Sequence, residues 1–126
     1  MRLSKNFHIS EFACKDGTKV PSEYYDNVAR LANSLQALRD YLSAPVRINS
    51  SYRHEDYNKA VGGSKNSQHL YARAADITVD GYTPDQVAEA IETLIEERLM
   101  HNGGLGRYNS FTHYDVRSYR ARWDYR

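Results

Sequence analysis

The sequence predicts an α+β domain in which a small, largely antiparallel sheet is flanked by two main helices. Two stretches repeat apolar residues every three or four positions, as amphipathic helices do, and four shorter stretches have the composition of strands. Their order along the chain is helix, strand, strand, helix, strand, strand, which favours this fold class. At 126 residues the chain is long enough for one core and short for two, so we expect a single domain over residues 1–126.

The first helix is expected to follow Pro21-Ser22-Glu23 and to end near Ser43-Ala44. It ends there because a residue that precedes a proline, here Pro45, disfavours helical geometry. The segment Val46–Ser50 then alternates apolar and polar residues and predicts a short strand with one buried face. The apolar stripe of the helix consists of Val28, Leu31, Leu35, Leu38 and Leu42.

Residues 51–68 are polar and irregular, with a short helix expected around His54 to Ala60 and a loop over residues 61–66. Loops of this kind often carry binding and catalytic residues. A second strand is expected over Asp76–Asp80, followed by a turn at Gly81-Tyr82.

The second helix is expected to start at Thr83-Pro84-Asp85-Gln86, which supplies an N-cap hydroxyl, a proline at the first helical position and a glutamine for a capping box. Asn102-Gly103-Gly104 is expected to stop it. Residues 105–108 and 111–116 then predict a hairpin. The buried stripe of the helix would be Val87, Ile91, Leu94, Ile95 and, at its end, Arg98-Leu99.

The charge distribution excludes one class of partner. The formal net charge is +1 and both signs are mixed along the chain, so the basic stripe of a nucleic-acid binder is missing and neutral or zwitterionic substrates are expected. No apolar run reaches transmembrane length, and residues 1–6 lack the apolar stretch of a signal peptide. We expect a monomer that is made in the cytoplasm and does not insert into membranes. The single cysteine, Cys14, cannot form an internal disulfide and is expected to be packed.

Four side chains offer donors for one divalent metal ion. His69 and Asp76 lie seven residues apart before a short apolar run, and His113 and Asp115 lie two apart in a strand-like segment. If both segments enter one sheet, three donors can converge and leave a position for water, as a catalytic zinc requires. His69, Asp76 and His113 supply that set. A turn or cap role for Asp76, without a metal, remains the alternative.

Asp115 has three roles open to it. On a strand its side chain leaves the same face as that of His113, so it is the candidate general base for a metal-activated water. It could instead be a metal ligand or a group that orients an imidazole. The remaining histidines are expected to be surface or satisfied core residues and not ligands: His8, His54 and His101.

Arg53 and the tyrosines are the candidates for substrate contacts. Arg53 directly follows the first strand, where its guanidinium could grip a substrate carboxylate or a developing oxyanion, with a structural ion pair as the alternative. The eleven tyrosines could give the cleft flat, amphipathic walls or be ordinary half-buried residues.

Several linked motifs resemble the zinc D-alanyl-D-alanine carboxypeptidase family, which includes peptidoglycan endopeptidases and phage endolysins and shares its fold with the hedgehog signalling domain. The resemblance covers nearly the whole chain, including a short N-terminal segment, Phe7 to Cys14, typical of the single-domain branch. The motifs are Ser50-Ser51-Tyr52-Arg53, Asn58, Val61-Gly62-Gly63, Ser67-Gln68-His69, Ala74-Ala75-Asp76, Gly103-Gly104-Leu105-Gly106, Phe111-Thr112-His113-Tyr114-Asp115, Arg117 and Trp123.

This resemblance implies a zinc peptidase that cleaves peptide bonds in peptidoglycan stem peptides or crosslinks and acts on the cell wall after release. By the resemblance, His69, Asp76 and His113 are the Zn²⁺ ligands and Arg53 contacts the substrate. Ser67 and Tyr108 are expected to bind substrate beside them. Carboxypeptidase and endopeptidase activity both remain open.

Two positions depart from the family. Many relatives place a carboxylate three residues before the last histidine, where this chain has Ser110, so Asp115 is the expected replacement base. Ala72 stands where relatives have a glycine, and at positive φ an alanine costs about 1 kcal/mol. The alternative function is a zinc-containing module that binds cell-wall peptides or a protein partner without cleaving them.

Overall fold

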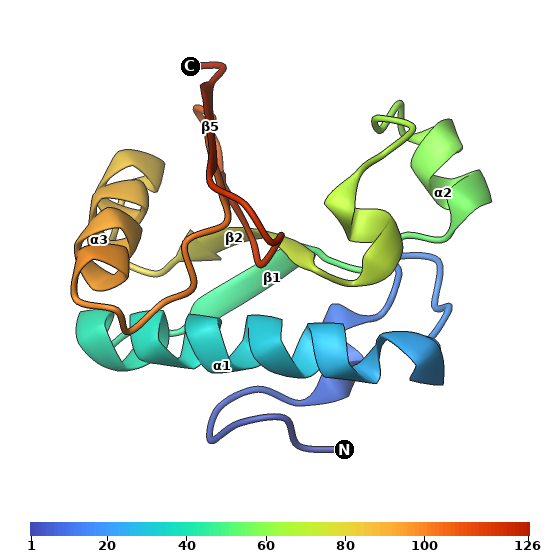
Figure 1. Ribbon diagram of the computed structural model, residues 1–126, viewed down its shortest axis with the longest axis horizontal. Coiled ribbons are helices and arrows are strands. Elements are labelled where there is room, and N and C mark those ends of the chain that lie inside the picture. Colours follow the sequence, from blue (N-terminus) through green and yellow to red (C-terminus); the bar gives the residue numbers. More distant parts are fainter.

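The computed structural model describes residues 1–126 as a five-stranded sheet supported by two main helices (Figure 1). The α+β class with two main helices is therefore confirmed. The helices are α1 (Tyr25–Leu42), α2 (Glu55–Ala60) and α3 (Pro84–Glu96), with single 3-10 turns at η1 (Ile9–Phe12), η2 (Ser22–Tyr24) and η3 (Gln68–Tyr71). The strands are β1 (Val46–Ser50), β2 (Ala74–Val79), β3 (Gly104–Arg107), β4 (Thr112–Asp115) and β5 (Ala121–Asp124).

The strands follow the order β1-β2-β4-β3-β5, and every pairing is antiparallel except that of β3 with β5. The largely antiparallel sheet is thus confirmed, including the hairpin of β3 and β4. The register of β2 on β4 places Asp76 opposite His113. Because β4 lies between β2 and β3, its side chains can contact residues from both neighbours.

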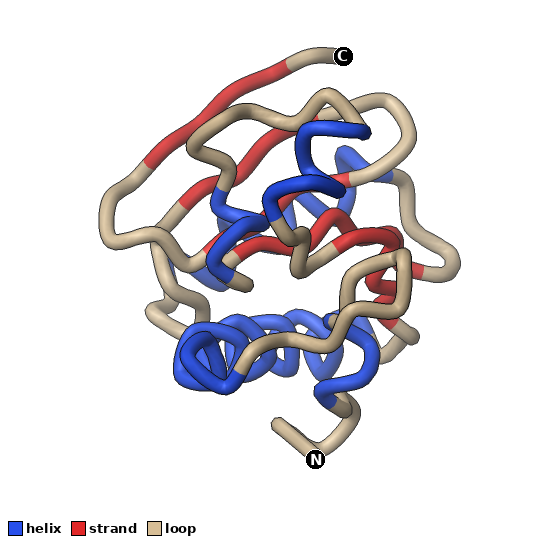
Figure 2. The backbone as a smooth tube through the Cα atoms, turned by 90° about the vertical axis from the view of Figure 1, so that its right-hand side faces the viewer, coloured by secondary structure: helices blue, strands red, loops and turns tan.

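α1 runs beneath the sheet, and α3 packs against α1 and against β2, β3 and β4 (Figure 1). Seen from the side, α1 forms its own layer below the strands (Figure 2). The predicted apolar stripe of α1 is buried over its whole length, because residues three and four apart share one helix face. The predicted capping box of α3 is present as well, with Thr83 Oγ1 and Gln86 Oε1 bonded to each other's backbone amides.

The predicted end of the second helix was wrong. α3 ends at Glu96, and Arg98 takes a left-handed conformation with φ of +62°. The amides of Leu99 and Met100 both return to the carbonyl of Leu94, so the chain reverses before it reaches the predicted stop. Leu99 is consequently 58% exposed, and Met100 fills the buried position instead.

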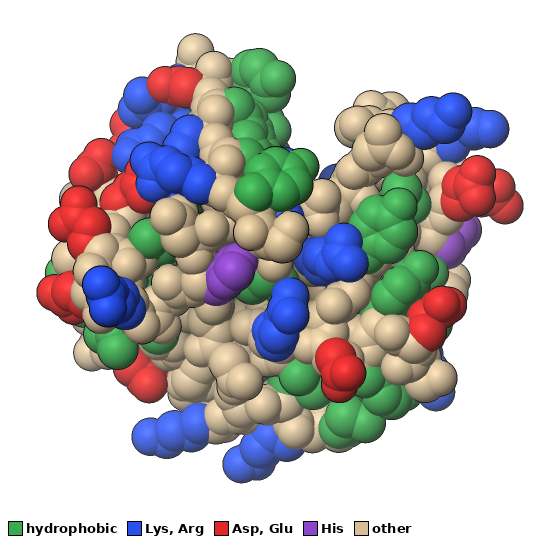
Figure 3. Space-filling view, in the orientation of Figure 1, with side chains coloured by type: hydrophobic (Ala, Val, Ile, Leu, Met, Phe, Trp, Pro, Cys, Tyr) green, Lys and Arg blue, Asp and Glu red, His purple; other side chains and the backbone are tan.

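No helix is long and apolar enough to cross a membrane. On the side of the C-terminal strands away from α3, α2 lies across from β5 (Figure 1). The space-filling view shows the molecule hollowed between the side chains over β5 and those over the α2 region (Figure 3). Six of the seven predicted site residues line a cleft in this part of the molecule, and the seventh, Asp115, does not.

Candidate metal centre

Three of the predicted donors converge on one point. The ligating atoms of His69, Asp76 and His113 all lie within 4.8 Å of one another. Asp76 Oδ1 is 3.3 Å from His69 Nε2 and 3.0 Å from His113 Nδ1. Each donor comes from a different element, since His69 lies in η3, Asp76 in β2 and His113 in β4.

The backbone fixes the orientation of the His69 ring. Its Nδ1 lies 2.6 Å from the carbonyl oxygen of Ser51. A carbonyl only accepts, so Nδ1 carries the proton and Nε2 presents its lone pair toward Asp76. The Ser67 hydroxyl caps η3 by accepting the His69 amide at 3.2 Å, and Arg53 N donates to the His69 carbonyl at 3.0 Å.

The His113 ring lies between two carboxylates. Its Nε2 is 2.7 Å from Asp115 Oδ2, and its Nδ1 is 3.0 Å from Asp76 Oδ1. Burial lowers the pKa of His113, but the bonds to Asp115 and Asp76 raise it more, so the net pKa is above the ordinary value. The position between Asp76 and the ring is therefore one that attracts positive charge.

Asp115 lies behind His113 and away from the cleft. Its Oδ1 accepts the amides of Gly104 at 2.9 Å and Arg117 at 3.1 Å, and the Arg117 guanidinium bonds both of its oxygens. The residue is 0% exposed. Both oxygens are thus occupied and shielded from water. Of the roles that the sequence left open, this position fits the group that orients an imidazole and does not fit the general base, because strand periodicity alone does not reveal what encloses a side chain.

The charge state of the two aspartates follows from their partners. Burial raises the pKa of Asp76, but hydrogen bonds with His113 and His69 lower it further, to a net value well below its usual range. For Asp115 burial also raises the pKa, and the bonds with His113 and Arg117 more than reverse this. Both carboxylates are ionised at neutral pH. Asp76 can therefore bind a cation directly, and Asp115 can accept a hydrogen bond from the ligand His113.

Arg53 reaches the edge of the same cluster. Its guanidinium contacts Asp76 Oδ2 at 3.5 Å, Asn58 Oδ1 at 3.4 Å and Ser50 Oγ at 3.2 Å. The side chain is 16% exposed and lines the cleft. It is therefore held in place by long hydrogen bonds while one edge faces the space above the donors.

The cleft over the donors has a volume of about 440 Å³. Tyr108 forms part of its wall, stacked on Phe111 with ring centroids 4.3 Å apart, and the Tyr108 hydroxyl accepts Trp123 Nε1 at 2.9 Å. Ser67 lines the opposite side. Ser110 is exposed and does not line the cleft, and Asp76 is the only carboxylate residue among those that do.

The donor set fits a divalent ion of intermediate softness. Two imidazole nitrogens with their protons directed elsewhere and one ionised carboxylate oxygen are the ligands typical of a catalytic zinc site, which keeps a further position open. Without a cation, the raised pKa of His113 favours a proton between its Nδ1 and the charged Asp76 oxygen at 3.0 Å, which is the position that a bound cation would take. The residues therefore fit Zn²⁺.

The sequence profile of the peptidase M15 family matches residues 5–115. The chain belongs to the peptidase M15 family. This confirms the family inferred from the sequence motifs and makes the protein a metallopeptidase. Among curated proteins, none matches the chain.

One residue of this M15 peptidase is held in a strained conformation next to a donor. Ala72 ends η3 with φ of +55°, in the left-handed region, three residues after His69. The expected cost of about 1 kcal/mol applies here. The methyl group is fully buried in the core, and its packing offsets part of that cost.

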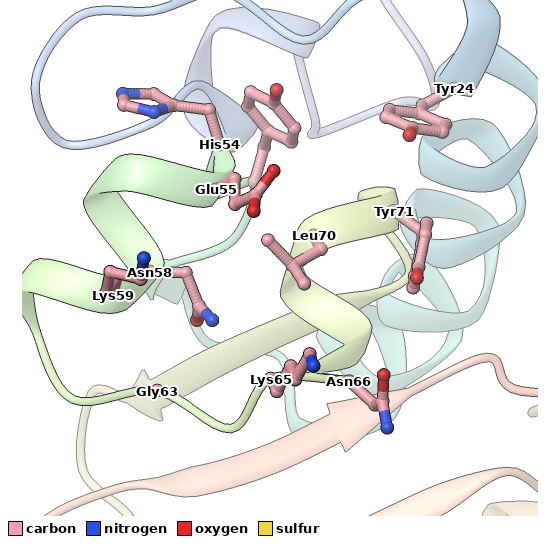
Figure 4. Close-up of a pocket in the computed structure, with 11 residues that line it drawn as sticks. Tyr24, His54, Glu55, Asn58, Lys59, Gly63, Lys65, Asn66, Leu70 and Tyr71 are labelled. Carbon is pink, nitrogen blue, oxygen red and sulfur yellow. The ribbon is translucent and has the colours of Figure 1, made fainter.

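A larger cavity of about 800 Å³ lies on the other side of Gly63, between α2, η3 and the start of α1 (Figure 4). It contains none of the three donors. Gly63 borders both spaces, and a Cβ on it would overlap Asn58 Oδ1. The loop of this M15 peptidase between α2 and η3 thus separates the metal cleft from a second hollow.

Sequence reasoning did not assign roles to Trp123, Arg117 or Gly104. The Trp123 ring packs 4.9 Å from that of His113 and covers Gly106, while Arg117 lies over Trp123 at 5.2 Å. Trp123 lies on β5, which was not predicted because its only pairing is the parallel one with β3, an earlier strand of the chain. The sequence offered one signal for this close packing, the glycines Gly104 and Gly106 in a short strand motif, since a glycine within a strand often marks the close approach of another group.

Proposed function

We propose that this metallopeptidase holds Zn²⁺ with His69, Asp76 and His113 and hydrolyses peptide bonds in the stem peptides or crosslinks of peptidoglycan. The observation that carries the proposal is the convergence of two imidazole nitrogens and one carboxylate oxygen within 4.8 Å at the base of a cleft. Bound zinc supplies a Lewis acid that polarises a scissile carbonyl and lowers the pKa of water.

The protein's own residues orient the metal ligands and stabilise charge on the substrate. Asp115 accepts a hydrogen bond from His113 Nε2 and so keeps His113 Nδ1 directed at the position of the ion. Arg117 holds Asp115 in place through two hydrogen bonds. Arg53 stabilises negative charge on the substrate, either a terminal carboxylate or the oxyanion formed during attack. Asp76 Oδ2 holds Arg53 beside the reaction while Asp76 Oδ1 serves the ion.

The cleft suits a short, flexible peptide. One wall is aromatic, formed by Tyr108 and its neighbours, and the opposite wall is formed by the loop from Gly62 to Gln68, where Ser67 can bond the substrate backbone. Stem peptides have a flexible backbone and carboxylates that match Arg53. We further propose that the protein acts as a monomer on the cell wall, as a lysin does after release, either trimming a terminal D-amino acid or cutting a crosslink.

A second candidate function is a zinc-containing module that binds such peptides without cleaving them. It is favoured by one observation, that Asp76 is the only carboxylate residue lining the cleft, so a free general base is missing there. If the purified protein hydrolyses the peptides and this activity depends on the metal, the binding-module candidate is excluded.

The test is to incubate zinc-loaded protein with purified peptidoglycan fragments, with and without a chelator, and to identify the products by mass. Chelator-sensitive release of D-alanine would assign a carboxypeptidase, and chelator-sensitive splitting of dimers an endopeptidase. A His69→Ala variant serves as the matched control, because it removes one metal ligand and keeps the proposed substrate contacts Arg53, Ser67 and Tyr108. Intact fragments at saturating zinc would reject the proposal.

A further inference from the structure

A second cluster of metal donors lies outside the cleft. Cys14, Asp16 and His54 each offer one ligand atom, a sulfur, a carboxylate oxygen and an imidazole nitrogen, and these atoms lie within 4.8 Å of one another. None of the three belongs to the proposed catalytic set. From the sequence, His54 was expected to be a surface or satisfied core residue and not a ligand, and Cys14 was expected to be packed.

The N-terminal loop, defined as residues 13–18, is folded so that two of these donors face the same way. Cys14 N donates to the Thr18 carbonyl at 2.8 Å, and Gly17 N donates to the Cys14 carbonyl at 2.9 Å, which closes a tight turn with Gly17 at φ of +93°. The Thr18 amide binds Asp16 Oδ1 at 3.0 Å. The other oxygen, Asp16 Oδ2, is thereby left to face His54.

His54 meets this loop from a different part of the chain. It is the N-cap of α2, and its Nε2 lies 2.5 Å from Asp16 Oδ2. Figure 4 shows its ring turned away from Leu70 and Tyr71, out of the neighbouring cavity. Its Nδ1 accepts the Tyr57 amide at a long 3.3 Å. The tautomer that frees Nε2 for an ion gives up this weak bond and the bond from Nε2 to Asp16, and the ion replaces the second of these.

Burial and charge differ among the donors in a way that suits ion capture. Cys14 is 3% exposed, whereas the side chains of Asp16 and His54 are 38% and 30% exposed. Bonds with His54 and then with Thr18 lower the pKa of Asp16 well below its usual range, so this carboxylate is ionised at neutral pH. An ion can therefore reach the oxygen and nitrogen from solvent, with the sulfur beneath them.

We propose that Cys14, Asp16 and His54 form a second metal site that takes Zn²⁺ or an ion of similar softness and joins the N-terminal loop to the start of α2. A thiolate together with an imidazole selects zinc-like ions over Mg²⁺ and Ca²⁺, and water fills the remaining positions. Binding releases the thiol proton of Cys14, since the thiolate is the ligand. His54 directly follows Arg53, so the site also anchors the chain next to the cleft.

The site can be tested without reference to hydrolysis, because Cys14 is the only cysteine in the chain. Chelator-treated protein titrated with Co²⁺ is expected to bind two ions and to develop a near-ultraviolet thiolate-to-cobalt charge-transfer band. Imidazole and carboxylate ligands in the cleft cannot produce that band. Saturation at one ion with no such band would overturn the proposal.

Variants separate the two sites. Cys14→Ser is expected to lose the band and one bound ion and to keep metal-dependent hydrolysis, while His69→Ala keeps the band and loses hydrolysis. Asp16→Asn checks the result with the cysteine intact. It should raise the Co²⁺ concentration that is needed to develop the band at least tenfold. In the His69→Ala background, Zn²⁺ should raise Tm, and adding Cys14→Ser should abolish this shift. A band without any hydrolysis would uphold this site and reject only the proposed function.

Discussion

Gly104 lies directly opposite Asp115 in the β3–β4 ladder, and its amide donates to Asp115 Oδ1 at 2.9 Å. A Cβ at position 104 would overlap the Asp115 carboxylate. Since Asp115 is fully buried and bonded on both oxygens, it has no room to move away. The glycine therefore provides the space in which the partner of His113 is held.

Gly104→Ala is expected to destabilise the fold by about 1–3 kcal/mol, because overpacking forces the carboxylate or β3 to shift. Zinc affinity should fall as well, since His113 loses its orientation. Denaturant unfolding and competition with a chromophoric chelator measure the two effects. Gly81→Ala is the control: it has positive φ but no atom within 4 Å of the added Cβ, so it should reduce stability and leave zinc affinity unchanged.

Asp115→Asn is expected to lower zinc affinity by about 10–100-fold, because the amide is a poorer partner for His113 Nε2 than a carboxylate. Turnover should largely return when zinc is added to saturation. This distinguishes an orienting residue from a general base, whose loss no amount of zinc repairs. Activity that remains absent in a zinc-saturated variant would restore the base assignment.

Arg117→Lys should also lower zinc affinity, but by less, because lysine keeps the positive charge and loses the two-point contact with Asp115.

Arg53→Lys is expected to reduce kcat/KM by about 10²–10³ with zinc stoichiometry unchanged, as for the loss of one well-placed donor to a developing oxyanion. Steady-state kinetics on a defined stem peptide, with metal analysis of the same sample, provide the measurement. Arg47→Lys is the matched control, because Arg47 pairs with Asp80 in an exposed position away from the cleft. An equal kcat/KM in both variants would show that Arg53 only forms a structural ion pair with Asp76.

The acid stability of the metal-free protein should depend on Asp115. Its folded pKa is below the ordinary value of 3.8, so its contribution to the free energy of unfolding is present above about pH 4 and is lost as the pH falls further. The folded pKa of His113 is raised, so its contribution is present below its ordinary pKa of 6.5 and is lost as the pH rises through the raised value. Urea unfolding of chelator-treated protein across this range should show a less steep acid limb in Asp115→Asn. Parallel acid limbs would contradict the assignment.

Ser43→Gly is expected to stabilise the protein by about 0.5–1 kcal/mol. Ser43 closes α1 in the left-handed conformation with φ of +50°, where glycine avoids the steric cost of a Cβ. The side chain is exposed, so no packing is lost, and its only hydrogen bond is a long one of 3.4 Å to the Asp40 carbonyl. Thermal unfolding measures the gain, and Ser43→Ala, which keeps the Cβ, should show none.

The helices and the first four strands were predictable because their residues obey local periodicities. The stripe from Val28 to Leu42 is buried as its spacing requires, and β2 begins two residues before the predicted Asp76 and ends at Val79, one residue before the predicted Asp80. β5 was not predictable, since its burial depends on β3, which lies earlier in the chain, and its four residues include a charged Arg122. The end of α3 depended on one left-handed residue, Arg98, for which composition gives no signal.

The candidate site shows the same division. Spacing and motif identified His69, Asp76 and His113, which the fold does bring together. The protonation of the two rings could not be predicted, because it depends on the Ser51 carbonyl and on how Asp115 is enclosed. Both are outcomes of pairing between distant segments.

The strand order has a consequence for when the metal cluster comes into existence. Asp76 and His113 are 37 residues apart and meet only after β4 has inserted between β2 and β3. A chain still emerging from the ribosome must therefore have formed β4 before it can hold the ion, because the strand pairing that joins the two residues is non-local and forms late. Synthesis and hydrolytic competence are separated in time by the topology itself.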